Sequence, residues 1–499
     1  MFDCLKTVLL TASIALLPLA AVAQPMEYAT RQEFQQSVVS LAQMQTDVAL
    51  GRSVSAMMRD LGLPSAVAPM PIPESTAFMA DGAAVIELVD IRLLLAQVAV
   101  QSGARDHIAL VRAQGAREHD VILLRAGFAT LDDLFQLSRG TLAQDFVTRT
   151  ADGVVLTRPL AIWADAGLSL GEADQLILDR PSGSFLANLG WLNLTGGTIT
   201  GTDGPNTAEP DFRPFVLTAG QGAFTADGAI FRALGFGQAA VFGGIAIVNN
   251  GLTPPRLTSA LTNSTLADVS GVGLLGTTGA QLIANSLTGS AGTAILISQA
   301  QGSVVANNRL AGLAGPQAIR VTAGASDVTI SGNLVSGSPR TGILIDRDSR
   351  NITISGNLVQ GSLATAIAVD SATCIAVSAN LIATNGGAGV TLSDTDATTI
   401  NANAILFNRG AGILVRDQGQ AAQVWVAGNV FVGNREGLRG ATPGQVKLHN
   451  NDFEGQMPRV FAGDFAPLMV NWLRQRSAAL PAAATATLAS AACPNLTVQ

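Results

Sequence analysis

Residues 328–345 read VTISGNLVSGSPRTGILI, and the pattern in this stretch recurs through the second half of the chain. The stretch contains an aliphatic run, a small residue, Asn333 and a further aliphatic position. The equivalent asparagines are spaced 22 to 26 residues apart: Asn263, Asn285, Asn308, Asn333, Asn357, Asn380, Asn403, Asn429 and Asn451. A period of this length indicates a repeat protein.

Each repeat has a second phrase, a small residue followed by alternating aliphatic residues, as in Gly342-Ile343-Leu344-Ile345 and Gly412-Ile413-Leu414-Val415. These runs predict strands, and the Gly, Asn, Ser and Asp between them favour turns. One coil cannot fold alone, because burying about four aliphatic side chains contributes roughly 6–12 kcal/mol, whereas ordering each residue costs roughly 1–2 kcal/mol. Stacked coils remove this deficit. The sequence therefore predicts an all-β fold, a right-handed parallel β-helix in which the asparagines form a structural ladder.

Four segments are expected along the chain. Residues 1–23 have the features of a secretory signal peptide, with Lys6, an apolar core and a small-residue cleavage site; a buried N-terminal helix is the alternative interpretation. Residues 24–115 are expected to form a helical or irregular extension and residues 116–460 the β-helix. Residues 461–499 are expected to form a cap helix and a tail, because the open end of a solenoid exposes strand edges.

Composition excludes several classes of function. The formal charge of −7 argues against a nucleic-acid partner. No stretch after the signal has 18 uninterrupted apolar residues, so membrane insertion is not expected. Cys374 is interpreted as a small core residue; a disulfide with Cys493 is possible in an oxidising compartment, but nothing in the sequence supports it. No cluster of Cys and His is present, so no metal or other cofactor is predicted.

Four further motifs occur at fixed places: RAGFATLDDL at 125–134, DFRPFVL at 211–217, LGFG at 234–237 and DRDS at 346–349. In their order and spacing, from about residue 110 to 475, they resemble the periplasmic mannuronan C5-epimerases of alginate-producing bacteria. The resemblance implies a β-helix in the periplasm, a polysaccharide ligand and a connection with an exopolysaccharide secretion assembly.

Epimerisation at C5 of a uronate needs a cation for the carboxylate, a base on one face of the sugar and an acid on the other. In the family that this chain resembles, one coil carries the run Asp-Pro-His-Asp-Arg directly after a small residue and an isoleucine. The matching positions 296–300 read Leu-Ile-Ser-Gln-Ala, so Ser298 stands at the position of the histidine. No His or Tyr occurs between Asp120 and Leu448. We therefore expect the catalytic motif to be lost.

Some charge remains on the predicted coil surface. Arg320, Asp346, Arg347, Asp348, Asp370 and Arg416 occupy outward or strand-end positions on four of five successive coils. Arg320, Asp346, Arg347, Asp348 and Arg416 are the candidate substrate-binding residues, since Arg forks hold carboxylates and Asp accepts sugar hydroxyls; Asp346 and Arg347 are the alternative catalytic pair. The competing interpretation is a solvated turn with local Asp–Arg pairs. Outward Leu296, Leu344 and Leu414 make the face more apolar than a polyuronate groove requires.

Three functions follow. The first is a catalytically degenerate epimerase homologue that binds or guides an exopolysaccharide, alginate-like or other, during biosynthesis or secretion. The second is an active uronate C5-epimerase or lyase with a rebuilt site. The third, from another class, is a structural or adhesive β-solenoid without a sugar ligand.

Overall fold

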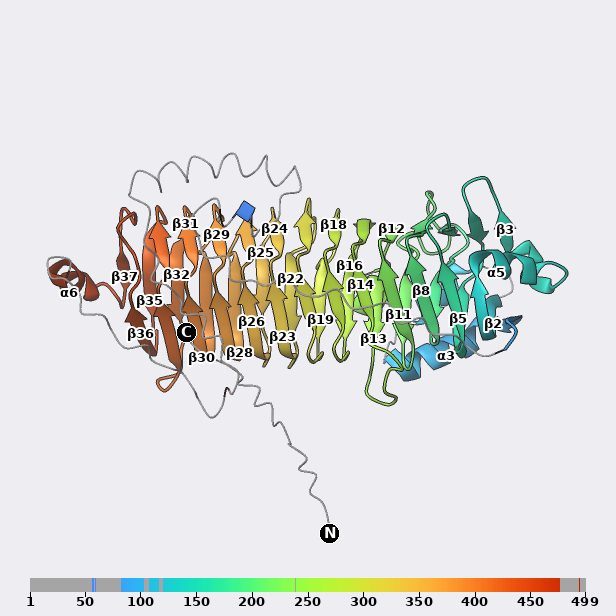
Figure 1. Ribbon diagram of the computed structural model, residues 1–499, viewed down its shortest axis with the longest axis horizontal. Coiled ribbons are helices and arrows are strands. Elements are labelled where there is room, and N and C mark those ends of the chain that lie inside the picture. The colour runs from blue at the N-terminus through green and yellow to red at the C-terminus, as the bar shows by residue number, and fades with distance from the viewer. Residues whose placement is uncertain are drawn as a thin grey trace, which may run out of the picture.

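The computed structural model describes residues 56, 57, 59, 82–102, 107–115, 120–237, 239–475 and 493. Within them the chain forms a parallel β-solenoid of about 13 turns, as Figure 1 shows, which confirms the predicted right-handed parallel β-helix. The expected signal peptide, residues 1–23, lies outside the described residues, as does most of the expected tail.

The coils carry strands on three faces. The first face contains strands that follow each other in parallel along the solenoid, except for the antiparallel β1: β1 (Val85–Asp90), β7 (Leu186–Asn188), β10 (Val216–Ala219), β13 (Gly244–Val248), β16 (Gly271–Leu275), β19 (Ile295–Ser298), β22 (Gln317–Thr322), β25 (Thr341–Ile345), β32 (Ala411–Arg416), β35 (Glu436–Ala441) and β37 (Phe461–Gly463). Because β1 pairs with the first full coil, the sheet already begins within the segment expected to form the N-terminal extension.

The second face follows the first within each coil. It contains β8 (Trp191–Thr195), β11 (Ala223–Asp227), β14 (Ala260–Thr262), β17 (Gln281–Ile283), β20 (Val304–Ala306), β23 (Ser326–Ser331), β26 (Arg350–Ser355), β33 (Gln423–Ala427) and β36 (Gln445–His449). Four long strands pass from the first face into the second: β2 (Asp120–Thr130), β5 (Leu160–Leu170), β28 (Ile367–Ser378) and β30 (Val390–Asn401).

The third face is a separate sheet of 13 strands. Its strands are β3 (Val147–Arg149), β4 (Val154–Leu156), β6 (Gln175–Leu178), β9 (Thr198–Gly201), β12 (Ile230–Leu234), β15 (Thr265–Val269), β18 (Ser286–Thr288), β21 (Arg309–Ala311), β24 (Leu334–Ser336), β27 (Leu358–Gln360), β29 (Leu381–Ala383), β31 (Ala404–Leu406) and β34 (Val430–Val432). Apart from β3 and β4, which pair antiparallel, the strands of this sheet pair in parallel.

The core is built from inward side chains that stack coil upon coil. On the first face Ile295, Ile319, Ile343, Ile367 and Val390 are register neighbours, and each is 0% exposed. Burying one such side chain contributes roughly 1.5–3 kcal/mol. The regular aliphatic phrase of the sequence therefore produces the continuous core that a single coil lacks.

The asparagine ladder is confirmed from Asn285 to Asn451, with one correction at its start. Along the ladder each side-chain amide donates to the carboxamide oxygen of the next member, for example Asn333 to Asn357 at 3.0 Å. Asn263 is not a member, because it lies one residue early, is exposed and has a φ of 49°. Ser264 occupies the ladder position, and its backbone N–H donates to the Asn285 side chain at 3.0 Å.

A second amide ladder, which the sequence analysis missed, runs where the third face turns into the first. Asn385, Asn408 and Asn434 form it with Gln456, through bonds of 2.9 Å, 2.9 Å and 3.0 Å. The same column is occupied by Ser362 and Ser338 in earlier coils, so no uniform residue marks it. Buried amides need partners, and in this column the partner is the equivalent residue on the next coil.

Two helices cover the N-terminal part of the first face. Helix α3 (Ile91–Ser102) and helix α4 (His107–Ala113) bury Leu94, Val98 and Leu110 against outward side chains of β2, β5, β7, β10 and β13. Phe185 and Phe215 lie in this interface, with their rings stacked at 4.7 Å. The two helices therefore cover the outer side of the first face from β2 to β13.

The two ends of the core are closed by short helices, which lie at opposite ends of Figure 1. Helix α5 (Leu131–Ser138) buries Leu131 and Leu134 at the N-terminal end, and η1 (Leu142–Asp145) follows it. The predicted C-terminal helix is present as α6 (Leu468–Gln475), and its Trp472 ring meets the Phe453 ring edge-on at 6.5 Å. Helix η2 (Ala240–Phe242) precedes β13.

Cys374 is buried, as the sequence predicts, and the structure decides the question of the disulfide that the sequence left open. Cys374 and Cys493 form a disulfide, with Cα atoms 5.6 Å apart and a sequence separation of 119. The pair packs against Ala376 and Ala397 on the second face. Sequence could not support this bond, because the contact depends on where the chain returns to the solenoid.

Among the described residues, no helix is long and apolar enough to span a membrane.

Candidate functional site

Beyond β16 the first face is no longer covered by the N-terminal helices. We call the outward positions from β19 to β35 the open face. Its middle column, one residue from each coil, consists of Leu296, Arg320, Leu344, Ala368, Thr391, Leu414 and Arg439. Its strand-end column consists of Ser298, Thr322, Asp346, Asp370, Ser393, Arg416 and Ala441. Leu296, Leu344 and Leu414 are partly exposed here, in agreement with the predicted apolar character.

Ser298 lies at the end of β19, partly exposed, beside Thr322 of the next coil. The Thr322 hydroxyl is buried and has no hydrogen-bond partner among the described residues. A hydroxyl becomes a nucleophile or a base only beside another base. The place where the resemblance puts a histidine therefore holds two alcohols, and no hydrogen bond joins either of them to a basic side chain among the described residues.

Arg320 and Asp346 are the two candidate residues that the fold brings together. Arg320 NH2 lies 2.6 Å from Asp346 Oδ2, and its Nε lies 3.4 Å from Oδ1. Their side chains are 25% and 12% exposed, so the two-point ion pair is partly shielded from water. The Asp346 backbone oxygen also accepts a bond from the Ser349 hydroxyl at 2.7 Å. The pair cancels its own charge, so the middle column from Leu296 to Leu414 holds no free cation, and the exposed Arg347 lies at the corner beyond this column.

The remaining candidates lie apart from this pair. Arg347 and Asp348 form the corner after β25, with φ values of 52° and 62°, and both are exposed. Asp370 is exposed in the strand-end column of the next coil. Arg416, two coils further on, approaches Asp417 at 3.6 Å, with both side chains at least half exposed. These residues follow one edge of the open face without forming a single catalytic cluster.

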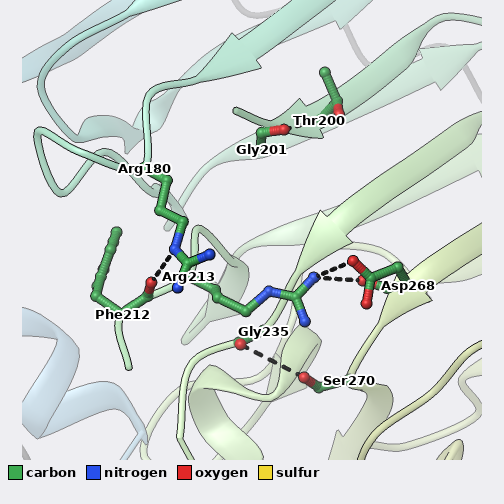
Figure 2. Close-up of polar contacts among 8 residues, drawn as sticks. All are labelled: Arg180, Thr200, Gly201, Phe212, Arg213, Gly235, Asp268 and Ser270. Carbon is green, nitrogen blue, oxygen red and sulfur yellow. Dashed lines mark hydrogen bonds and ion pairs between the residues drawn. The ribbon is translucent and has the colours of Figure 1, made fainter. Parts of the chain in front are cut away.

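Two of the sequence motifs are structural. Arg180 Nε donates to the Phe212 carbonyl at 2.7 Å, and Arg213 NH2 lies 2.6 Å from Asp268 Oδ2, as Figure 2 shows. These contacts fix the loop of the DFRPFVL motif. Gly235 of the LGFG motif has a φ of +124°, and an added Cβ would lie 2.2 Å from the Ser270 hydroxyl. Only glycine fits there.

Two charged residues of the open face were missed in the sequence. Glu436 begins β35 and its side chain is 4% exposed, while Arg439 of the same strand bonds to it at 3.1 Å. The sequence does contain a signal for Arg439, because the run Gly437-Leu438-Arg439 has the same alternation as the other strands and puts Arg439 at the outward position. This run has leucine where the earlier coils have isoleucine after the small residue, so it was not recognised as an equivalent strand.

Comparisons with known proteins agree with the geometry. The family described as periplasmic copper-binding protein (NosD) matches residues 258–457. The crystal structure of the periplasmic alginate epimerase AlgG is 15% identical, with a TM-score of 0.66, and the match covers 77% of this chain and 99% of that one. A mutant of AlgG gives 16% identity and a TM-score of 0.67 over the same shares. The predicted resemblance is thus confirmed for the fold.

A more distant solved structure, the A-module of the mannuronan C-5 epimerase AlgE4 from Azotobacter vinelandii, is 13% identical with a TM-score of 0.38, covering 61% of this chain and 87% of that module. No curated protein sequence matches the chain.

The residues present do not fit a copper site. Soft thiolate, thioether and imidazole donors select copper, and residues 258–457 contain only Cys374, His449 and Met457 of these types. Cys374 is bonded to Cys493. In the described part of the chain, no three His, Cys, Asp or Glu side chains gather as a metal site.

Proposed function

We propose that this protein binds an exopolysaccharide along the open face and guides it during biosynthesis or secretion in the periplasm, without epimerising it. The fold of the periplasmic epimerase, with a long uncovered face on parallel strands, supports polysaccharide binding. The observation that carries the non-catalytic part is the Arg320–Asp346 ion pair, with an Nη2–Oδ2 distance of 2.6 Å.

The argument from this pair is chemical. Epimerisation requires a free cation to neutralise the uronate carboxylate as the C5 proton leaves. In the middle of the open face the guanidinium of Arg320 is already held by Asp346 at two points. The ends of β19 and β22, where the resemblance puts the histidine, offer the hydroxyls of Ser298 and Thr322 in place of an imidazole base. An Asp–Arg pair of this kind still offers hydrogen bonds to sugar hydroxyls.

The test is binding of the purified protein to an array of bacterial polysaccharides, followed by titration of the best ligand. The Arg320→Ala/Asp346→Ala variant removes both partners and so leaves no unpaired charge. We expect it to bind at least about tenfold more weakly, because hydrogen bonds to charged groups contribute about 1.5–3 kcal/mol.

The matched control is the Arg213→Ala/Asp268→Ala variant, which removes an ion pair of the same 2.6 Å length away from the open face. Equal weakening in both variants would place the binding site elsewhere. Absence of binding to every polysaccharide would favour a structural or adhesive solenoid.

The rebuilt-enzyme alternative has its own readout. Deuterium transferred from solvent to C5 of a polyuronate, and lost in Asp346→Ala and Arg347→Ala variants, would show an active epimerase and overturn the proposal.

A further inference from the structure

A second charged region lies at the C-terminal end of the open face. Arg409, Arg435, Arg439 and Arg459 are exposed residues of neighbouring coils, and we call them the arginine cluster. None of the sequence motifs or candidate site residues includes them. Arg409, Arg435 and Arg459 lie at the edge opposite to the strand-end column, where the third face turns into the first, and Arg439 lies beside them in the middle column.

The second amide ladder sets the spacing of two members. Arg409 follows Asn408 and Arg435 follows Asn434, and these amides bond to each other at 2.9 Å. The backbone N–H of Arg435 donates to the carbonyls of Asn408 and Gly410 at 3.2 Å and 3.1 Å. The two arginines therefore lie on adjacent coils, about 4.8 Å apart along the solenoid.

A buried carboxylate orients the other two members. Glu436 is 4% exposed at its side chain and lies 3.1 Å from Arg439 NH1 and 4.0 Å from Arg459 NH1. Within the part of the chain that the structure describes, it is the only acidic residue that forms an ion pair with these arginines. Glu436 thus contacts two of the four guanidinium groups, and Arg409 and Arg435 have no acidic partner among the described residues, which leaves a local excess of positive charge.

The middle of the open face has the opposite character. There the Arg320–Asp346 pair is neutral, and the exposed Arg347 offsets only one of the two exposed acids Asp348 and Asp370. The charge of this face therefore becomes more positive towards its C-terminal end, which favours an anionic chain there over the middle. Guanidinium groups hold oxyanions through paired N–H donors, which is the geometry of carboxylate and sulfate recognition.

We propose that the arginine cluster is a binding site for oxyanion groups, carboxylate or sulfate, on the polysaccharide. This inference rests on the proposed function for the polymer and adds its charge class and a second contact region. The site would anchor one end of the chain while the neutral middle of the face contacts sugar hydroxyls.

The test compares a polyuronate, dextran sulfate and uncharged dextran as ligands of the wild-type protein and the Arg435→Gln/Arg459→Gln variant. This variant keeps the Arg439–Glu436 ion pair and so leaves no buried charge without a partner. We expect the wild type to bind at least one anionic polymer at least about tenfold more tightly than dextran. We expect the variant to lose most of that preference, with a weaker dependence of affinity on salt.

Arg232→Gln is the control, because Arg232 is an exposed arginine of β12 on the third face, away from the cluster. Unchanged binding of anionic polymers by the double variant, or equal loss in the control, would overturn the inference. If the wild type binds dextran as tightly as the anionic polymers, the cluster is not an oxyanion site, but the proposed function stands. If it binds none of the three and nothing on the array, both fail. Preference between polyuronate and dextran sulfate identifies the group bound.

Discussion

The first face has two parts that share one fold and are stabilised differently. From β2 to β13 its outer side is buried under α3 and α4, with aromatic rings in the interface. From β19 to β35 its outer side is open, amide ladders connect the coils of this half, and one disulfide ties Cys493 to Cys374 of β28. The difference shows that a β-helix can leave a long face open for a ligand. In that case hydrogen bonds at the turns between faces, rather than a covering layer of helices, stabilise the stacked coils.

The largest expected effect comes from the covered part. Phe215 is 0% exposed and lies between the Phe185 and Phe242 rings, at 4.7 Å and 5.0 Å. Phe215→Ala should lower the free energy of unfolding by about 3–5 kcal/mol, because it leaves a cavity beneath the helices. Denaturant titration measures the loss. On the open face, Leu344→Ala should change the midpoint little, and equal losses would break the distinction between the two parts.

The disulfide gives the next effect, and it belongs to the open half only, because residues 82–260 contain no cysteine. Cys493→Ser should cost about 2–4 kcal/mol, since the cross-link constrains a long loop in the unfolded chain. Thermal unfolding of the wild type with and without reductant is the measurement. Reductant should lower the unfolding temperature of the wild type to that of the variant and leave the unfolding temperature of the variant unchanged. A variant whose unfolding temperature falls in reductant would contradict the disulfide between Cys374 and Cys493.

The ladder sharpens the comparison further. Asn357 is 0% exposed and donates to Ile330 O and Asn380 Oδ1 at 2.9 Å each. Asn357→Ala should cost about 1–3 kcal/mol, because the Asn333 amide loses its acceptor in the interior. Asn263→Gly is the matched control, since Asn263 is exposed and outside the ladder and glycine adopts its φ of 49° freely; it should cost under about 0.5 kcal/mol. Chemical denaturation distinguishes the two.

The smallest effects depend on pH, with one carboxylate in each half. The Asn351 side chain, which donates to Asp327, lowers the pKa of Asp327 against the opposing effect of burial. The Thr130 backbone and side chain lower the pKa of Asp133 in the capping box of α5. Both folded-state pKa values lie below the unfolded value of about 3.9. Each contribution is therefore present above about pH 4 and is lost as the pH falls through the folded-state pKa.

Asp327→Asn and Asp133→Asn should each be less stable than the wild type at pH 5, by under about 1 kcal/mol because both sites are solvated. The difference should shrink towards pH 2.5 in equilibrium unfolding. A difference that stays constant over this range would rule out titration of these groups as its source.

Much of the architecture could be predicted from the sequence because its signal is local and repeated. The Asn333 phrase and the Gly342-Ile343-Leu344-Ile345 phrase specify a turn and a strand, and only stacking satisfies both. The error at Asn263 has the same source. Asn263 was assigned to the ladder because it is an asparagine near the expected position, but the backbone register places Ser264 opposite Asn285. The second ladder escaped notice because its residue type changes along the solenoid, from Ser to Asn to Gln.

The candidate site could be predicted only as a set of positions. The alternation placed Arg320, Asp346 and Asp370 on one face, but the side-chain partners depend on distances between coils that no local pattern contains. Sequence alone thus determined the repeat and the inward and outward alternation, since both are properties of residue type and spacing. That Ser298 stands at the position of the family's histidine stays a prediction from the resemblance. Tertiary structure decided that Arg320 neutralises Asp346, that the helices cover half of the first face, and that Cys374 finds Cys493. These contacts join residues from 26 to 119 positions apart, and only the packed chain brings them within bonding distance.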